Sequence, residues 1–485
     1  MNHVSEASSG WVREQSIYRR NRAIVVGGSL AGLLTARVLS DHFAEVRLLE
    51  KDPLSDDVRP RPGVPQSQHL HALLPRGLNI IESLFPGICE ELRSYGAIPL
   101  DIGDDVAWLT PQGWGVKFRS ELEALSFTRD LLDFIVRRRV IALKNVALSH
   151  RWEVGGLVRS ASGSILGVRA RELNADPRAP YLQVPGDLVV IATGRLNAIS
   201  KWFDDAGIEQ PMLTTVNAHI GYASRMYRRP SHHPSDWQAV ILQAAPPATH
   251  RSGLVFPVEG DRWLVTLIGA DRDYPPNDDT GFLEFARSLA NPCLYQAIRD
   301  AEPLTPIRAY RATDNRQLHL DQIRDWPDGL IVLGDAACAF NPVYGQGMST
   351  AAIEASLLST LLGTSSPLGN PFRGFQRRIA QVIKSPWTLA TSADLRFRSV
   401  EGAHANWRTR IMHWYVDRVL RLGTTDRWSR KRFLEVQGML RDTSAILKPD
   451  MAWRVLLSLG QSSNGSARHS PATSYLANGV DVPSH

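Results

Sequence analysis

The 485-residue sequence contains little cysteine, only Cys89, Cys293 and Cys338. Three cysteines so far apart form neither a disulfide framework nor a zinc-ligand pattern, so we expect no metal centre. They are typical of small buried side chains in a reducing compartment, and we therefore predict a cytoplasmic protein.

Lysine is also scarce. Only seven of the 55 basic residues are lysine, so the net charge of +6 is carried by arginine. The arginines are dispersed among acids and form no basic stripe with interleaved aromatic residues, which argues against nucleic-acid binding. No run of about 18 apolar residues is present, so we predict no membrane span. Two or three domains are expected at this length.

A dinucleotide-binding pattern is present near the N-terminus, in residues 23–39. An apolar strand leads into the turn Gly-Gly-Ser-Leu-Ala-Gly, and a helical pattern follows it. Gly27 permits the tight turn, and Gly32 lets the helix pack closely against the strand. The first N–H groups of the helix would face a pyrophosphate.

The next predicted strand, residues 46–50, ends in an acid. Glu50 follows Gly27 at the spacing of the carboxylate that bonds the adenosine ribose in dinucleotide folds. The middle glycine of the pattern is replaced by Ser29, which narrows the approach to the phosphate. Strand, turn, helix and acid together indicate a nucleotide cofactor rather than a simple tight turn.

A second pattern lies about 300 residues further along, between Gly334 and Gly347. An apolar strand, residues 329–333, precedes it, and an alanine-rich helical pattern, residues 348–362, follows it. Asp335 can bond a ribityl hydroxyl, and the loop of proline and glycine directs N–H groups at an electron-rich ring edge. The two patterns predict one FAD bound by a discontinuous domain.

The remaining patterns place further elements. Arg129 begins a helix where a contact to the phosphate or ribityl part of a cofactor is plausible. The buried strand at 188–195 is expected to close the cofactor domain's sheet. Residues 205–310 alternate as in an antiparallel sheet, with a hairpin at 253–268, and one face of this sheet is free to roof a pocket. After residue 372 the pattern is helical and rich in tryptophan, which favours packing over a substrate cage.

The predicted fold is therefore α/β, with a Rossmann-like FAD-binding domain, an inserted antiparallel-sheet substrate domain and a helical C-terminal region. The predicted segments are a disordered leader (1–22), the FAD-binding domain (23–80, 125–200 and 311–372), the substrate domain (81–124 and 201–310), the C-terminal helices (373–460) and a flexible tail (461–485).

The sequence resembles the class A flavoprotein monooxygenases, which have a hydroxybenzoate-hydroxylase-like fold. Within that family it looks most like the bacterial polyether epoxidases and related polyketide-tailoring monooxygenases of antibiotic biosynthesis. The resemblance covers roughly residues 20–375. It is carried by residues 23–50, Gly63-Val64-Pro65-Gln66 with His69 and His71, Arg129, residues 192–195, Asn315-Arg316, residues 326–330 and residues 334–348.

The resemblance implies FAD as cofactor and NAD(P)H as a transient co-substrate. It further implies oxygen transfer from a flavin C4a-hydroperoxide to a small hydrophobic, polyketide-like substrate by epoxidation or hydroxylation. No obligatory acid or base is implied, and the flavin-facing loop would be Pro342, Gly345, Gln346 and Gly347. The implied cofactor-binding residues are Gly27, Ser29, Leu30, Ala31, Gly32, Glu50, Lys51, Arg61, Arg129, Thr193, Gly194, Asp335, Pro342, Gly345, Gly347 and Met348.

Three departures from the family pattern keep other functions open. Thr193-Gly194 replaces the usual Asp-Gly, Leu196-Asn197 replaces a small Gly-Ser pair, and Gln68 replaces an arginine. The main alternative is a non-redox, FAD-dependent cyclase that forms decalins by cycloaddition. A flavin halogenase is disfavoured, because the sequence lacks the Trp-x-Trp-x-Ile-Pro motif and the positioned lysine. His69 and His71 are candidates for acid–base groups, although a structural role is favoured.

Overall fold

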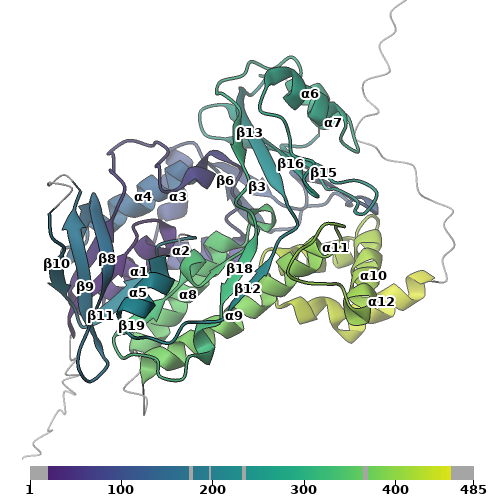
Figure 1. Cartoon of the computed structure of the whole chain (residues 1–485). Coiled ribbons are helices and arrows are strands. Elements are labelled where there is room, and N and C mark those ends of the chain that lie inside the picture. Colours follow the sequence, from purple (N-terminus) through teal and green to yellow (C-terminus); the bar gives the residue numbers. More distant parts are fainter. Residues whose placement is uncertain (1–19, 174–178, 196–197, 232–235, 364–369, 460–485) are drawn as a thin grey trace, which may run out of the picture.

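The computed structural model describes residues 20–173, 179–195, 198–231, 236–363 and 370–459. Most of the predicted leader, all of the predicted tail and the Leu196-Asn197 pair lie outside these residues. The predicted leader is too long, because strand β1 (Arg20–Val26) already begins at Arg20. A parallel sheet with its helices, an antiparallel sheet and a group of C-terminal helices form three adjoining parts (Figure 1).

The parallel sheet has the strand order β19-β11-β1-β2-β7. Its further strands are β2 (Phe43–Glu50), β7 (Val146–His150), β11 (Leu188–Ile191) and β19 (Leu330–Val332). All four pairings are parallel, and β11 and β19 are buried throughout, as expected for strands covered on both faces. The prediction that β11 closes the sheet is wrong, because the apolar β19 pairs beyond it and forms the edge.

Helices cover this sheet and share its hydrophobic core: α1 (Leu30–Ser40), α2 (Pro75–Leu84), α3 (Ile88–Ser94), α4 (Arg129–Ile141), α8 (Gly347–Gly363) and α9 (Pro371–Asp394). Two predicted boundaries need correction. Ile88 of α3, assigned to the substrate domain, is buried in this core, and so is Phe375 of α9, assigned to the C-terminal region. Both helices are amphipathic, and the parallel sheet with its helices offers the apolar surface that their faces need.

A three-stranded antiparallel sheet lies beside the parallel one. It consists of β8 (Trp152–Arg159), β9 (Ile165–Glu172) and β10 (Leu182–Pro185), and α5 (Ala198–Asp205) packs against β8. Small sheets also join distant segments: β3 (Ile98–Asp101) pairs with β6 (Glu123–Ser126), while β12 (Leu213–Val216), β18 (Asn315–Leu318) and β20 (Cys338–Ala339) form a three-stranded sheet.

The larger sheet is antiparallel except for the parallel pair β14–β4, and its order is β17-β13-β16-β15-β14-β4-β5. Its strands are β4 (Val106–Thr110), β5 (Gly113–Trp114), β13 (Gly221–Arg228), β14 (Ala239–Leu242), β15 (Arg251–Val258), β16 (Arg262–Gly269) and β17 (Arg308–Tyr310). The predicted hairpin is confirmed as β15–β16. Helices α6 (Asp279–Arg287) and α7 (Cys293–Ile298) cover one face around Phe282, which leaves the other face for the rest of the molecule.

The C-terminal helices are α10 (Trp407–Leu422), α11 (Arg427–Gln437) and α12 (Pro449–Leu459). Figure 1 shows them gathered beyond the end of the long helix α9. Short 3₁₀ turns complete the fold: η1 (Pro65–Gln68), η2 (Leu320–Gln322), η3 (Gly334–Ala336), η4 (Pro342–Tyr344) and η5 (Thr443–Leu447). Among the described residues, no helix combines the length and apolar character needed to cross a bilayer.

Candidate functional site

The two sequence patterns predicted to serve one cofactor lie against each other. Gly334, in the turn after β19, has a φ of +63°, and a Cβ there would lie 2.9 Å from the Cβ of Ala31 in α1. Helices α1 and α8, which follow the two patterns, pack side by side. Parallel strands β1 and β19 end at the same edge of the sheet, where α/β folds bind their ligands.

The turn between β1 and α1 depends on its glycines. Gly27 has a φ of +105°, and a Cβ there would lie 2.4 Å from the carbonyl oxygen of Ala192. A Cβ on Gly32 would lie 1.8 Å from the carbonyl oxygen of Gly27. Ser29 is the N-cap residue of α1, but its hydroxyl makes no capping bond, so the first N–H groups of the helix stay available for an anion.

Two arginines from distant segments converge on this turn. Arg129, the first residue of α4, donates from Nη2 to the Ser29 hydroxyl at 2.9 Å. Arg61 donates from Nη1 to the carbonyl oxygen of Gly28 at 3.0 Å. Asp133 lies between them, 3.4 Å from Arg61 Nε and 3.6 Å from Arg129 Nη2. The sequence reasoning missed Asp133, although its position four residues after Arg129 on a helix was an available signal.

Glu50, at the end of β2, is held by the backbone. It accepts hydrogen bonds from the Gly28 amide at 2.6 Å and from the Asp52 amide at 2.8 Å. These bonds fix the carboxylate beside the glycine turn, and each oxygen keeps a further lone pair for a ribose hydroxyl. Lys51, in contrast, does not join the cluster, because its ammonium lies 3.0 Å from Glu153 and is mostly exposed.

Several buried polar atoms at the site have no hydrogen-bond partner within the described chain. They include the donors Arg61 Nη2, Arg129 Nε and Thr193 Oγ1 and the acceptor Asp133 Oδ1. Unpaired buried donors are costly and therefore rare, so their clustering points to a ligand that accepts hydrogen bonds. A Cβ on Gly194, the residue after Thr193, would meet no atom within 4 Å. Cationic donors, bare helix N–H groups and open space beside a glycine fit the pyrophosphate of FAD.

Asp335 and α8 form the second half of the site. Burial raises the pKa of Asp335, although Arg195 and Arg129 oppose the shift. A Cβ on Gly347, the first residue of α8, would lie 3.6 Å from Asp335 Oδ1, so the carboxylate and the helix N-terminus are neighbours. Met348 is buried in the first turn of the helix. These placements suit Asp335 as the ribityl partner that the resemblance implies.

The predicted flavin-facing loop, residues 342–347, comprises η4, Gly345, Gln346 and Gly347, the first residue of α8. Gly345 has a φ of +67°, and a Cβ there would lie 3.0 Å from Ala72 Cβ, so the loop contacts the His69–Ala72 segment. Gln346 is buried, and its Oε1 has no hydrogen-bond partner in the described part of the chain. The loop is therefore held by its neighbours and presents an unpaired polar atom.

The free face of the large antiparallel sheet reaches this loop through His69. Its Nδ1 lies 2.8 Å from the Ser224 hydroxyl, which lies 2.7 Å from the Thr266 hydroxyl. The rings of Tyr222 and Tyr310 lie 5.7 and 5.5 Å from the imidazole. Burial lowers the pKa of His69 to about 4, so the ring is neutral near pH 7. A neutral, buried, hydrogen-bonded histidine agrees with the favoured structural role.

His71 is also neutral near pH 7. Burial lowers its pKa to about 3, and Arg129 adds a smaller effect in the same direction. Its Nδ1 lies 2.9 Å from the carbonyl oxygen of His69. The described residues contain no group of histidine, cysteine and carboxylate side chains suited to a metal ion.

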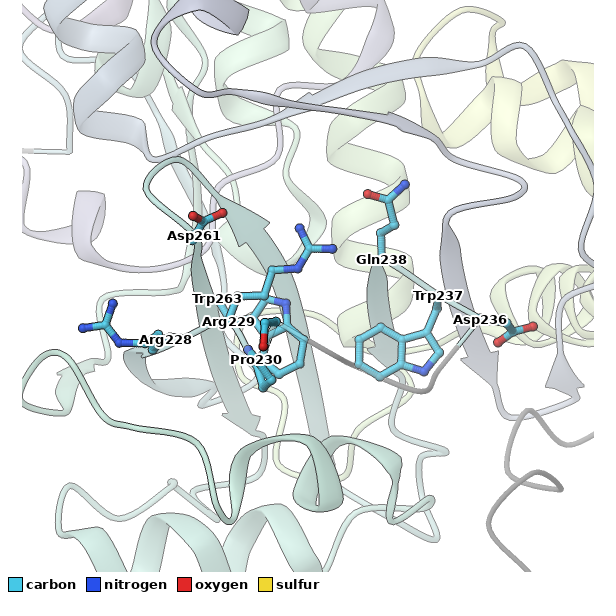
Figure 2. A pocket seen from close by; sticks show the side chains of 9 residues that line it. Arg228, Arg229, Pro230, Asp236, Trp237, Gln238, Asp261 and Trp263 are labelled. Atoms are coloured by element: carbon cyan, nitrogen blue, oxygen red, sulfur yellow. The ribbon is translucent and has the colours of Figure 1, made fainter. Parts of the chain in front are cut away.

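A separate pocket of about 740 Å³ lies at the other end of the same strands (Figure 2). Its lining includes Arg228, Trp237 and Trp263. On β16 the pocket residue Trp263 lies three residues before Thr266, so about 10 Å of strand separates this pocket from the Ser224–Thr266 pair beside His69. It is therefore distinct from the predicted cofactor site.

The chain is similar in sequence to known proteins over most of its length. Protein Rv3254 of Mycobacterium tuberculosis is 30% identical over 390 residues, which cover 78% of this chain and 81% of that protein. Kynurenine 3-monooxygenase of Salinispora tropica is 25% identical over 408 residues, with the same coverage of both chains. No protein-family model matches the chain.

Solved structures share the fold at low sequence identity. The flavin-dependent brominase Bmp2 superposes with a TM-score of 0.63 at 13% identity, covering 90% of this chain and 98% of that one. PqsL of Pseudomonas aeruginosa superposes with a TM-score of 0.57 at 16% identity, covering 78% and 98%.

Fold and site define a flavoprotein of the FAD-binding α/β type. The chain belongs to the class A flavin monooxygenase family, whose cofactor is FAD. Its neighbours in fold include both FAD-dependent monooxygenases and halogenases, so the fold alone does not define the reaction.

Proposed function

We propose that this protein is a cytoplasmic FAD-dependent monooxygenase that uses NAD(P)H and O₂ to epoxidise or hydroxylate a hydrophobic, polyketide-like natural-product intermediate. The observation that carries the proposal is the convergence of three segments: the glycine turn with its two arginines, the Asp335–Gly347 half of the site, and the His69 cluster of the antiparallel sheet. Together they supply a cofactor cradle and a roof over its reactive end.

The chain's own residues would act by binding and by excluding water. Arg61 and Arg129 would hold the pyrophosphate, Glu50 the adenosine ribose and Asp335 the ribityl chain. The N-terminus of α8 would place its positive dipole end at the ring's N1–C2=O edge. When bound, FAD supplies the redox and oxygen-transfer chemistry, which needs little acid–base help from the protein.

The apolar character of the roof supports a hydrophobic substrate. Val343, in the flavin-facing loop, packs with a cluster that contains Ile220, Tyr222 and Ile268 of the antiparallel sheet region. An apolar wall excludes water from reactive oxygen species and stabilises an apolar substrate by burial. His69, neutral near pH 7 and bonded to Ser224, is poorly suited to proton transfer there.

The experiment that tests the proposal is incubation of the purified holoprotein with polyketide pathway intermediates, with and without NADPH, followed by mass spectrometry. A product that gains one oxygen atom, only with NADPH and O₂, supports it. A matched reaction of an Asp335→Ala variant controls for oxidation outside the site. A product of unchanged mass formed without NADPH would contradict the monooxygenase and support the FAD-dependent cyclase instead.

A further inference from the structure

A buried carboxylate lies at the end of α9 and faces the loop predicted to contact the flavin. Asp394 is 0% exposed. Its Oδ1 accepts a hydrogen bond from the Tyr344 hydroxyl at 2.6 Å and from Asn341 Nδ2 at 3.1 Å. Its Oδ2 accepts from Asn315 Nδ2 at 2.6 Å. Three donors from outside α9 thus converge on one carboxylate.

These bonds fix both ends of the Asn341–Tyr344 turn, which forms the first part of the flavin-facing loop. Asn341 is the N-cap residue of η4, and its Oδ1 accepts from the Val343 amide at 3.2 Å. The backbone N–H of Asn341 donates to Asn315 Oδ1 at 2.8 Å. Tyr344, the last residue of η4, is held by Asp394 directly. The turn is therefore tied at its start and at its end to the same side chain.

The surroundings of Asp394 favour this role over an ion pair. None of the described basic side chains forms an ion pair with it, and its partners are neutral donors. Besides Asp394 itself, Arg195 and Tyr310 influence the pKa of Tyr222, and Tyr222 and Arg396 influence the pKa of Tyr344. Burial raises the pKa of Asp394 to about 6, and its hydrogen bonds limit the rise. An unpaired buried carboxylate is costly, so its donors must compensate for lost hydration.

The cluster also reaches the roof of the site. The Tyr222 hydroxyl donates to Asn341 Oδ1 at 3.2 Å, and Tyr222 packs against His69. Arg195 donates from Nη2 to the carbonyl oxygen of Phe340, the residue before Asn341, at 2.5 Å. The antiparallel sheet, the loop after β11 and helix α9 therefore all meet at this turn.

We propose that Asp394 is a positioning residue for the cofactor ring, because it holds the Asn341–Tyr344 turn, and with it the N-terminus of α8, in the conformation that faces the isoalloxazine. This inference rests on the proposed function, which places the ring beside residues 342–347. Through α9, a segment outside both cofactor patterns contributes to the flavin's environment.

The test compares holoprotein variants by the midpoint potential and absorption spectrum of bound FAD. In Asp394→Asn, the new amide N–H₂ faces the donors of Asn315 and Asn341, so the turn loosens. The helix N-terminus favours the more negative reduced ring, so binding of reduced FAD should weaken about tenfold more than binding of oxidised FAD, which lowers the midpoint potential by about 30 mV. Tyr344→Phe removes one donor and should shift the potential in the same direction by less.

Thr391→Val is the matched control, because Thr391 lies buried one turn earlier on α9 and its hydroxyl donates to the carbonyl oxygen of Trp387, away from the Asp394 cluster. It should leave potential and spectrum unchanged. The wild-type FAD spectrum should also titrate near pH 6, and that titration should be absent from Asp394→Asn.

A purely structural role for Asp394 predicts a different result. Asp394→Asn and Tyr344→Phe would then lower the melting temperature and leave the potential and spectrum of bound FAD unchanged, which would overturn the proposal while leaving the FAD site intact. If Asp394→Asn does not fold, Tyr344→Phe decides between the two. A wild-type protein that neither retains nor binds FAD would contradict the proposed function itself.

Discussion

The closest backbone approach in the site makes Gly32→Ala a sharp test. The added Cβ would lie 1.8 Å from the carbonyl oxygen of Gly27, which is 1.6 Å short of the 3.4 Å at which ordinary contact begins. The obstacle is backbone and cannot rotate away, so α1 must move from the turn. Overpacking of this kind costs up to ~3 kcal/mol, while alanine gains ~1 kcal/mol over glycine in a helix. We expect a net loss of about 2 kcal/mol.

The effect on FAD should exceed the effect on stability, because the displaced part is the helix end that faces the pyrophosphate. We expect FAD binding to weaken at least ~tenfold, measured by titration of the apoprotein and by flavin absorbance after gel filtration. Gly374→Ala is the matched control: Gly374 is exposed on α9, and a Cβ there would meet nothing within 4 Å. This variant should be slightly stabilised and should bind FAD normally.

The reasoning is refuted if Gly32→Ala retains the wild-type melting temperature and FAD content. The prediction also fails if Gly374→Ala loses as much stability as Gly32→Ala, because the loss could then not be assigned to the contact with Gly27.

Arg129→Gln should weaken FAD binding about tenfold or more, because it removes a buried cationic donor, whereas Lys51→Ala should leave FAD affinity unchanged in the same titration. Burial raises the pKa of Glu354 in α8 from its ordinary value of 4.5 to about 8. Between these two pH values the folded protein holds a proton that the unfolded chain releases, so the free energy of unfolding falls as the pH rises. Glu354→Gln should abolish that fall, at most ~1.4 kcal/mol per pH unit, in melting curves across pH, and an unchanged slope would contradict the assignment. Burial lowers the pKa of His69 to about 4, so this residue destabilises the fold as the pH falls from 6.5 to about 4. His69→Gln should therefore reduce the fall of the melting temperature over this acidic range. A fall as steep as in the wild type would argue against a buried neutral ring.

Local patterns along the chain were enough to predict FAD as the cofactor. The glycine spacing at 27–32 and the acid at the end of β2 follow from backbone sterics and strand length, which are properties of adjacent residues. The same holds for Asp335 between an apolar strand and a helix. The β15–β16 hairpin was predicted because period-two alternation with a central turn is also a local signal.

Contacts between distant segments could not be predicted in this way. The sequence could not tell whether β11 or β19 forms the edge of the parallel sheet, because both are short, fully apolar strands. Lys51 follows a ligand position in sequence, yet its side chain points to Glu153. Asp133 acquires its role only because α4 brings it between two arginines from different segments.

The sequence by itself therefore determined the kind of protein: a glycine turn, two strand-terminal acids and a flavin loop can be recognised from neighbouring residues. Only the tertiary structure decided what surrounds the ring. Asp394 lies in a helical stretch that has no cofactor motif, and it matters because packing buries its carboxylate against Asn315, Asn341 and Tyr344. Burial and convergence arise from the whole fold, so no local pattern of residues encodes them.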